Sequence, residues 1–154
     1  MAIPFKRLFT ILITIAAVLQ GCSETTIDCS TVLCVGDSPI RLELIENGTN
    51  LLADPTYTEA DFSISGDVGT EVTIFLSRGL QGNTEALLEI SDSSWQPGNG
   101  TFSLSLPGDR SIDFSTVFGE TTGECCGGAL TVEQLQSQQV PVSSNAGYFT
   151  LTLD

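Results

Sequence analysis

Apolar and polar residues alternate through most of this chain, and that alternation restricts its fold more than any other feature. In the run 40–44, Ile40, Leu42 and Leu44 alternate with Arg41 and Glu43. Similar runs lie at 61–65, 72–76, 86–90, 101–106, 112–114, 130–132 and 149–153. Successive side chains of a β-strand point to opposite faces of the sheet, so the pattern predicts about eight half-buried strands.

Turn-forming residues separate these runs at short intervals. Asn47-Gly48 is typical of a two-residue hairpin turn, and Pro107-Gly108-Asp109 indicates a second tight hairpin. Further loop signals lie at 78–83, 96–100 and 136–146. The segment 56–61 allows at most one helical turn, and no stretch sustains a period of 3.6 residues. The expected fold is therefore an all-β, antiparallel β-sandwich with an Ig-like architecture.

Four cysteines accompany the predicted strands: Cys29, Cys34, Cys125 and Cys126. A bridge between Cys29 and Cys34 would leave the adjacent Cys125 and Cys126 to bond each other in a strained ring. We therefore expect Cys29 to bond one member of the adjacent pair and Cys34 the other. A zinc site is the alternative, although structural zinc sites favour two residues between paired cysteines, whereas this chain has four between Cys29 and Cys34, none between Cys125 and Cys126, and no His.

The first 21 residues have the layout of a bacterial signal peptide. Lys6 and Arg7 precede the apolar run 8–19. At about 1.5 Å per residue this run is too short to cross a hydrocarbon core of about 30 Å. It ends in Leu19-Gln20-Gly21-Cys22. This sequence resembles the lipobox of bacterial lipoproteins, in which an aliphatic residue, a tolerant position and a small residue precede the cysteine.

The lipobox resemblance implies that residues 1–21 are removed and that Cys22 carries diacylglycerol. A second acyl group on the new N-terminus would make the membrane attachment stable. Ser23 stands where Asp signals inner-membrane retention in enteric-type bacteria, so the expected location is the bacterial outer membrane. Glu24 and Asp28 leave open whether the protein occupies the periplasmic or the cell-surface face. A plain signal peptide followed by a chance cysteine is the alternative.

Removal of the leader leaves a length suited to one domain, with residues 22–28 as a short tether and residues 29–154 as a single β-sandwich domain. The full chain has 19 acidic and 5 basic residues, no His and a net charge of −14. Loss of Lys6 and Arg7 changes this charge to −16 and removes the only Lys. The mature chain therefore has no imidazole base and no Schiff-base amine. Its charge also disfavours nucleic acid and anionic lipid headgroups as partners.

Acidic side chains supply the candidates for metal binding. Asp54, Glu59 and Asp61 cluster in the sequence, and loops that provide several oxygens bind Ca²⁺. No diagnostic calcium motif is present, so solvated surface acids are the alternative and no other cofactor is expected. A glycosidase would need two carboxylates about 5 to 10 Å apart across a cleft. The acids here fall in turns or at outward strand positions, so we expect no catalysis.

Two aromatic residues are candidates for ligand binding. Trp95 is the only Trp and precedes the loop signal at 96–100, where it could form an exposed platform for a sugar ring. A single Trp at the end of a strand more often packs into the core. Tyr57 could likewise form an exposed platform or pack into the core.

The layout of the mature chain, including IDCSTVLCVG, WQPGNGTFSLSL, ECCGGALTV and GYFTLTLD, resembles small uncharacterised lipoproteins of polysaccharide-degrading Gram-negative bacteria. The resemblance implies a cell-envelope β-domain and transfers no activity or functional residue. We expect a lipid-anchored, non-catalytic binding module for an envelope protein or an extracellular glycan. The alternatives are a carboxylate-dependent hydrolase, such as a glycosidase, and a structural subunit of a surface complex.

Overall fold

The computed structural model describes residues 29–31, 33–34, 36–79 and 86–153. The chain divides into a first unit, Met1–Val32, and a second unit, Leu33–Asp154. The 3-10 turn η1 (Cys29–Thr31) belongs to the first unit, and all the described strands belong to the second. The predicted leader, the lipidated Cys22 and the tether 22–28 lie outside the described residues.

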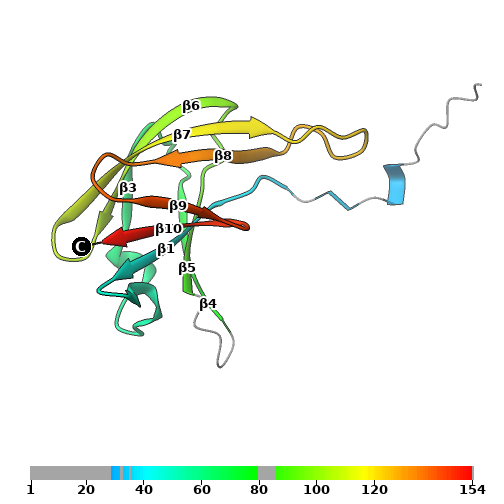
Figure 1. Ribbon diagram of the computed structural model, residues 1–154. Coiled ribbons are helices and arrows are strands. Elements are labelled where there is room, and N and C mark those ends of the chain that lie inside the picture. The colour runs from blue at the N-terminus through cyan, green and yellow to red at the C-terminus, as the bar shows by residue number, and fades with distance from the viewer. Residues whose placement is uncertain (1–28, 32, 35, 80–85, 154) are drawn as a thin grey trace, which may run out of the picture. The chain divides into compact units, whose positions relative to one another are not determined.

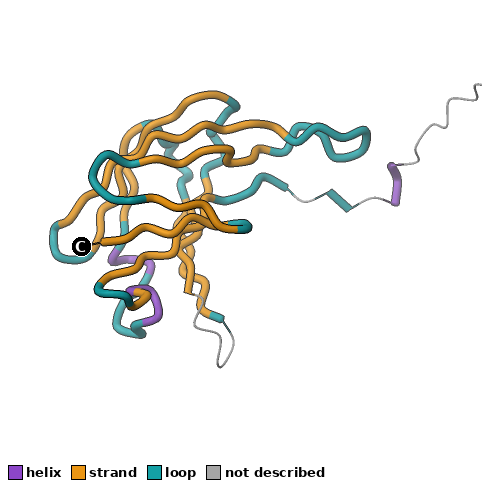
Figure 2. The backbone as a smooth tube through the Cα atoms, viewed as in Figure 1, coloured by secondary structure: helices purple, strands orange, loops and turns teal. Residues whose placement is uncertain are grey.

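The second unit is built from two β-sheets (Figures 1 and 2). Its described strands are β1 (Ile40–Glu46), β2 (Thr49–Asn50), β3 (Ser63–Gly66), β4 (Thr73–Arg78), β5 (Ala86–Ser91), β6 (Gly98–Leu106), β7 (Arg110–Glu120), β8 (Leu130–Gln136), β9 (Val142–Asn145) and β10 (Tyr148–Leu153). The first sheet has the order β4-β5-β1-β10-β9, with β2 beside β1. The second sheet has the order β3-β6-β7-β8. The predicted all-β sandwich is confirmed.

The sequence alternation places one side of each strand in the core. In β1, Ile40, Leu42 and Leu44 are fully buried, whereas Arg41 between them is exposed. In the second sheet Phe102 of β6 lies opposite Phe114 of β7, and their stacked rings have centroids 5.1 Å apart. Burial of these apolar side chains is the main favourable contribution to folding.

Three features of the sheets differ from the sequence prediction. β1 and β10 pair in parallel, with Leu44 opposite Leu151, whereas antiparallel pairing was expected throughout. β9 lies inside the predicted polar loop 136–146, because an edge strand needs little apolar alternation when most of its side chains are exposed. β6 begins at Gly98, within the predicted loop 96–100.

Both predicted tight hairpins are present. Asn47 and Gly48 have φ values of 51° and 75°, as the turn between β1 and β2 requires. Gly108 and Asp109 have φ values of 80° and 57° in the turn between β6 and β7. The short helical turns η2 (Leu51–Ala53) and η3 (Glu59–Asp61) precede β3. η3 agrees with the helical turn allowed at 56–61, whereas η2 was not predicted.

Cys29, Cys34, Cys125 and Cys126 are all disulfide-bonded. Cys34 bonds Cys126 across 92 residues, with 5.2 Å between the Cα atoms, and Cys29 and Cys125 are disulfide-bonded as well. The expected bond from Cys34 to the adjacent pair is confirmed, and a bond between Cys125 and Cys126 is ruled out. Zinc needs thiolate ligands, so the alternative zinc site is wrong.

Among the residues that the structure describes, no helix is long and apolar enough to cross a membrane.

Candidate functional site

A polar recess of about 460 Å³ lies on the outer face of the second sheet. It is lined by the end of β3, the middle of β6 and β7, the end of β8 and the segment 137–139. Its lining residues are Gly66, Thr101, Phe102, Ser103, Asp113, Phe114, Ser115, Gln136, Ser137, Gln138 and Gln139. We call this site the outer recess.

Strand register gives the outer recess its polar surface. Thr101 of β6, Ser115 of β7 and Gln136 of β8 lie opposite one another across the three strands. Ser103 lies opposite Asp113, and its hydroxyl donates a hydrogen bond to that carboxylate. The neighbouring Phe102 and Phe114 point into the core, because alternate residues of a strand face opposite sides. The recess therefore offers hydroxyl and amide groups and one carboxylate.

The edge of β7 beside the outer recess lacks a strand partner over part of its length. β8 pairs with β7 only from Ser115 to Glu120. Before Ser115, the described contacts of this edge come from the side chain of Gln139. The N–H of Asp113 donates to Gln139 Oε1, and Gln139 Nε2 donates to the carbonyl oxygen of Ser111 at 3.4 Å. One side-chain amide thus occupies the position of a neighbouring strand.

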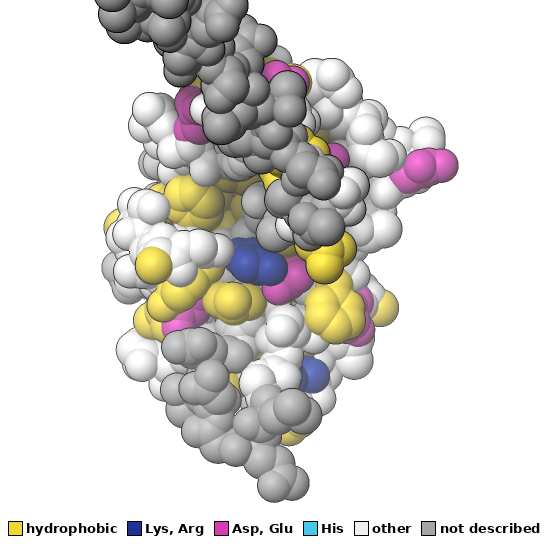
Figure 3. Space-filling model, turned by 90° about the vertical axis from the view of Figure 1, so that its right-hand side faces the viewer, with side chains coloured by type: hydrophobic (Ala, Val, Ile, Leu, Met, Phe, Trp, Pro, Cys, Tyr) yellow, Lys and Arg dark blue, Asp and Glu magenta, His cyan; other side chains and the backbone are white. Residues whose placement is uncertain are grey.

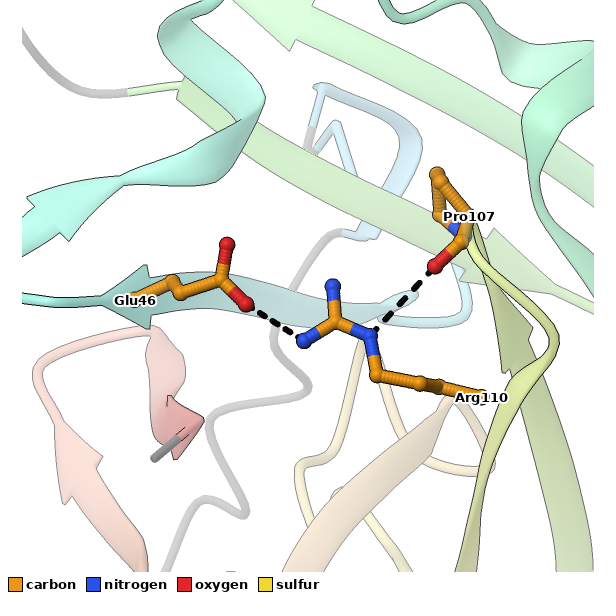
Figure 4. A network of polar contacts seen from close by, with 3 residues as sticks. All are labelled: Glu46, Pro107 and Arg110. Atoms are coloured by element: carbon orange, nitrogen blue, oxygen red, sulfur yellow. Dashed lines mark hydrogen bonds and ion pairs between the residues drawn. The ribbon is translucent and has the colours of Figure 1, made fainter.

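A smaller recess of about 230 Å³ lies beside the same edge. Its lining residues are Leu106, Arg110, Ser111, Ile112, Gln139, Val140 and Leu153. We call this site the inner recess, because Leu106, Ile112 and Leu153 belong to the core. Arg110 forms an ion pair with Glu46 of β1, and its Nε donates to the carbonyl oxygen of Pro107 at 3.4 Å (Figure 4). Gln139 lines both recesses.

The predicted calcium ligands each accept hydrogen bonds from other residues of the chain. Asp54 Oδ1 accepts from the Thr56 N–H at 2.9 Å and from its hydroxyl at 2.8 Å. Asp61 Oδ2 accepts from the Thr58 N–H at 2.7 Å, and Glu59 Oε1 accepts from the Leu76 N–H at 3.3 Å. No metal-holding group of three or more acidic, His or Cys side chains occurs in the described part of the chain. Asp54 and Asp61 thus accept hydrogen bonds from their own segment, whereas Glu59 accepts one from β4.

Hydrogen bonding also sets the charge state of two of these acids. The Thr56 N–H, followed by the Thr56 hydroxyl, lowers the pKa of Asp54. The N–H of Glu59 itself, followed by that of Leu76, lowers the pKa of the Glu59 carboxyl group. Both groups are therefore stabilised as carboxylates, the opposite of what a general acid needs.

The two aromatic candidates pack against the core. The Trp95 ring centroid lies 4.8 Å from that of Phe118 and 6.3 Å from that of Phe102. The ring centroid of Tyr57 lies 6.5 Å from that of Phe62. Both candidates are only partly buried, but their rings contact the core rather than the outer recess.

The outer face of the first sheet carries both apolar and charged side chains. Phe75 of β4 is 59% exposed on it, and Arg41 pairs with Glu89 at 3.2 Å. A recess of about 230 Å³ is lined in part by Arg41 and Tyr148 of this sheet. On the face shown in Figure 3, hydrophobic side chains form patches that basic and acidic side chains interrupt.

Sequence reasoning did not find the site around Gln139. The residues 136–139 are a polar stretch after a strand, and that signal predicted a loop. Only the register of β7 and β8 reveals that β8 ends before it covers Ser111 and Asp113.

In comparisons with known proteins, no family model matches this chain, and no curated protein or solved structure matches it either. The fold and the site define a β-sandwich with a polar recess at a partly unpaired strand.

Proposed function

We propose that this protein is a lipid-anchored binding module of the bacterial outer membrane, that it performs no catalysis, and that its ligand-binding region is the outer recess. The leader 1–21 and the lipobox ending at Cys22 support the anchor. Disulfide bonding of the mature body fits an oxidising compartment outside the cytoplasm.

The observation that carries the binding role is the set of groups in the outer recess. It combines hydroxyls and amides with a single carboxylate, Asp113. Hydrolysis of a glycosidic bond by the usual route needs a pair of carboxylates, whereas binding needs only convergent donors and acceptors. The rings of Trp95 and Tyr57 pack elsewhere and provide no stacking platform for sugars in this recess. This favours an envelope protein over a glycan as the ligand.

The anchor is tested by expressing the full chain and its Cys22→Ala variant in a Gram-negative host with labelled palmitate. We expect the label and outer-membrane fractionation for the wild type, and neither for the variant. A Cys22→Ala protein that stays membrane-bound, or a wild type without label, would overturn the proposed anchor.

The binding region is tested by placing a photo-crosslinking amino acid at Ser115, which faces the outer recess, or at Thr73, which is exposed on the other sheet. In intact cells, we expect a discrete cross-linked partner from position 115 and none from position 73. Equal cross-linking from both positions would contradict the assignment of the binding surface.

A further inference from the structure

The unpaired part of β7 presents the backbone groups that a further strand would bond. The carbonyl of Ser111 and the N–H of Asp113 face the same edge, since residues two apart along a strand are oriented alike. Both groups turn toward Gln139 rather than toward β6. In a sheet, a carbonyl and an N–H that flank one residue in this way form hydrogen bonds to a neighbouring strand.

The Gln139 side chain imitates that neighbouring strand. Its amide offers one acceptor to Asp113 and one donor to Ser111, the same two functions as a peptide group. Gln139 is exposed, so its side chain can swing into solvent while an incoming strand makes the same two hydrogen bonds. Natural sheets protect open edges in several ways, including cover by a neighbouring segment.

The two recesses supply the side-chain selectivity that strand addition requires. Alternate residues of an added strand point to opposite sides of the sheet. A residue opposite Ile112 would point to the apolar inner recess, and its neighbours would point to the hydroxyls of the outer recess. Asp113 and the −16 charge expected for the mature chain favour neutral or basic residues at these two flanking positions of the added strand.

We propose that β7 binds an extended segment of a partner protein at Ser111–Asp113, with the segment displacing the Gln139 amide and adding a strand to the second sheet. The segment carries an aliphatic side chain between hydroxyl-bearing or basic ones. This inference rests on the proposed binding function and specifies its partner and its mode of recognition.

The test uses a fluorescent, capped synthetic peptide in which Val alternates with Thr and Lys, and fluorescence anisotropy as the readout. Gln139→Ala removes the competing amide, and we expect it to strengthen peptide binding by up to about tenfold, the equivalent of one hydrogen bond. Gln138→Ala is the matched control, because Gln138 lines the same recess, and we expect no change.

A second pair of variants separates backbone from side-chain recognition. Asp113→Pro removes the edge N–H, whose position away from β6 is one that Pro tolerates, and we expect binding to fall by at least about tenfold. Asp113→Asn keeps the N–H and removes the charge, and we expect it to retain binding of an uncharged Val-Thr peptide. The same peptide with every backbone nitrogen methylated has no N–H to donate to the Ser111 carbonyl in either strand direction, and it should not bind the wild type or Gln139→Ala.

Three results would overturn strand addition. The first is an N-methylated peptide that binds as tightly as the unmethylated one. The second is an equal loss of peptide affinity in Asp113→Asn and Asp113→Pro. The third is no binding of the alternating peptide to Gln139→Ala at millimolar concentration. Cross-linking from position 115 could still succeed in each case, so the binding module would stand while this mode of recognition failed. Dimerisation of Gln139→Ala in sedimentation would make a second copy of this chain the occupant and would also overturn the proposed partner.

Discussion

Asp92 is a buried acid whose hydrogen bonds join two separate loops. Its side chain accepts from the N–H of Gly69 and, at 2.8 Å, from that of Ser94. Desolvation by burial acts to raise the pKa of Asp92, but hydrogen bonds from Ser94 and Gly69 outweigh it and hold that pKa below its usual value. The structure therefore favours the ionised form of this residue.

We expect Asp92→Asn to lower the free energy of unfolding by about 1 to 3 kcal/mol at neutral pH, because one amide oxygen cannot serve both N–H groups. A lowered pKa means that the charged group stabilises the fold above the unfolded pKa, near 3.8. That contribution is lost as the pH falls through the folded pKa. In urea titrations, the difference in free energy of unfolding between the wild type and Asp92→Asn should therefore shrink below about pH 4.

Asp109→Asn is the control for this comparison. Asp109 lies exposed in a turn with a φ of 57°, which Asn also adopts readily. The stability of the Asp109→Asn protein should therefore match that of the wild type at each pH. A constant deficit of Asp92→Asn down to pH 3 would contradict the role of the carboxylate charge.

At the level of elements, one arginine holds the segment that connects η2 to η3. Arg78, at the end of β4, donates from Nε to the Leu52 carbonyl and from Nη2 to the Asp54 carbonyl, each at 3.0 Å. Nη2 also donates to the carbonyl of Tyr57. The planar guanidinium can reach all three carbonyls, whereas a lysine ammonium has no such fork.

We therefore expect Arg78→Lys to destabilise the protein by about 1 kcal/mol and to speed proteolysis within residues 51–61. Arg41→Lys is the matched control, because Arg41 makes a single exposed ion pair with Glu89 and should change stability by less than about 1 kcal/mol. Equal cleavage of the two variants in limited proteolysis would contradict the anchoring role of Arg78.

Elements with an apolar alternation were predictable from the sequence, whereas the site was not. The pattern of Ile40, Leu42 and Leu44 depends only on one face being buried, so β1 was placed correctly. β9 exposes Ser143 and Ser144, and nothing in its composition distinguishes an edge strand from a loop. The role of Gln139 depends on where β8 stops pairing with β7, and pairing partners are set by the packing of distant segments.

For the molecule as a whole, electrostatic self-repulsion opposes folding. The full chain carries a net charge of −14, because its 5 basic residues cannot neutralise its 19 acidic ones. Raising the NaCl concentration from about 0.01 M to about 0.1 M shortens the Debye length from about 30 Å to about 10 Å. We expect the melting temperature to rise over this range in differential scanning calorimetry.

Divalent salts extend this test to the predicted calcium ligands. Because Asp54, Glu59 and Asp61 already accept hydrogen bonds from the protein, CaCl₂ and MgCl₂ at equal concentration should raise the melting temperature equally. A rise specific to Ca²⁺ would show that these acids, or others, bind the ion.

The parallel pairing of β1 with β10 affects the order in which the first sheet can fold. The side chains of Glu43 and Thr150 form a hydrogen bond although 107 residues separate them. A polypeptide that emerges N-terminus first during its synthesis delivers β1 early, yet β1 has no neighbour on one side until β10 emerges. The centre of the first sheet is thus completed only after nearly the whole polypeptide has emerged, and until then an apolar strand edge stays available to chaperones and proteases.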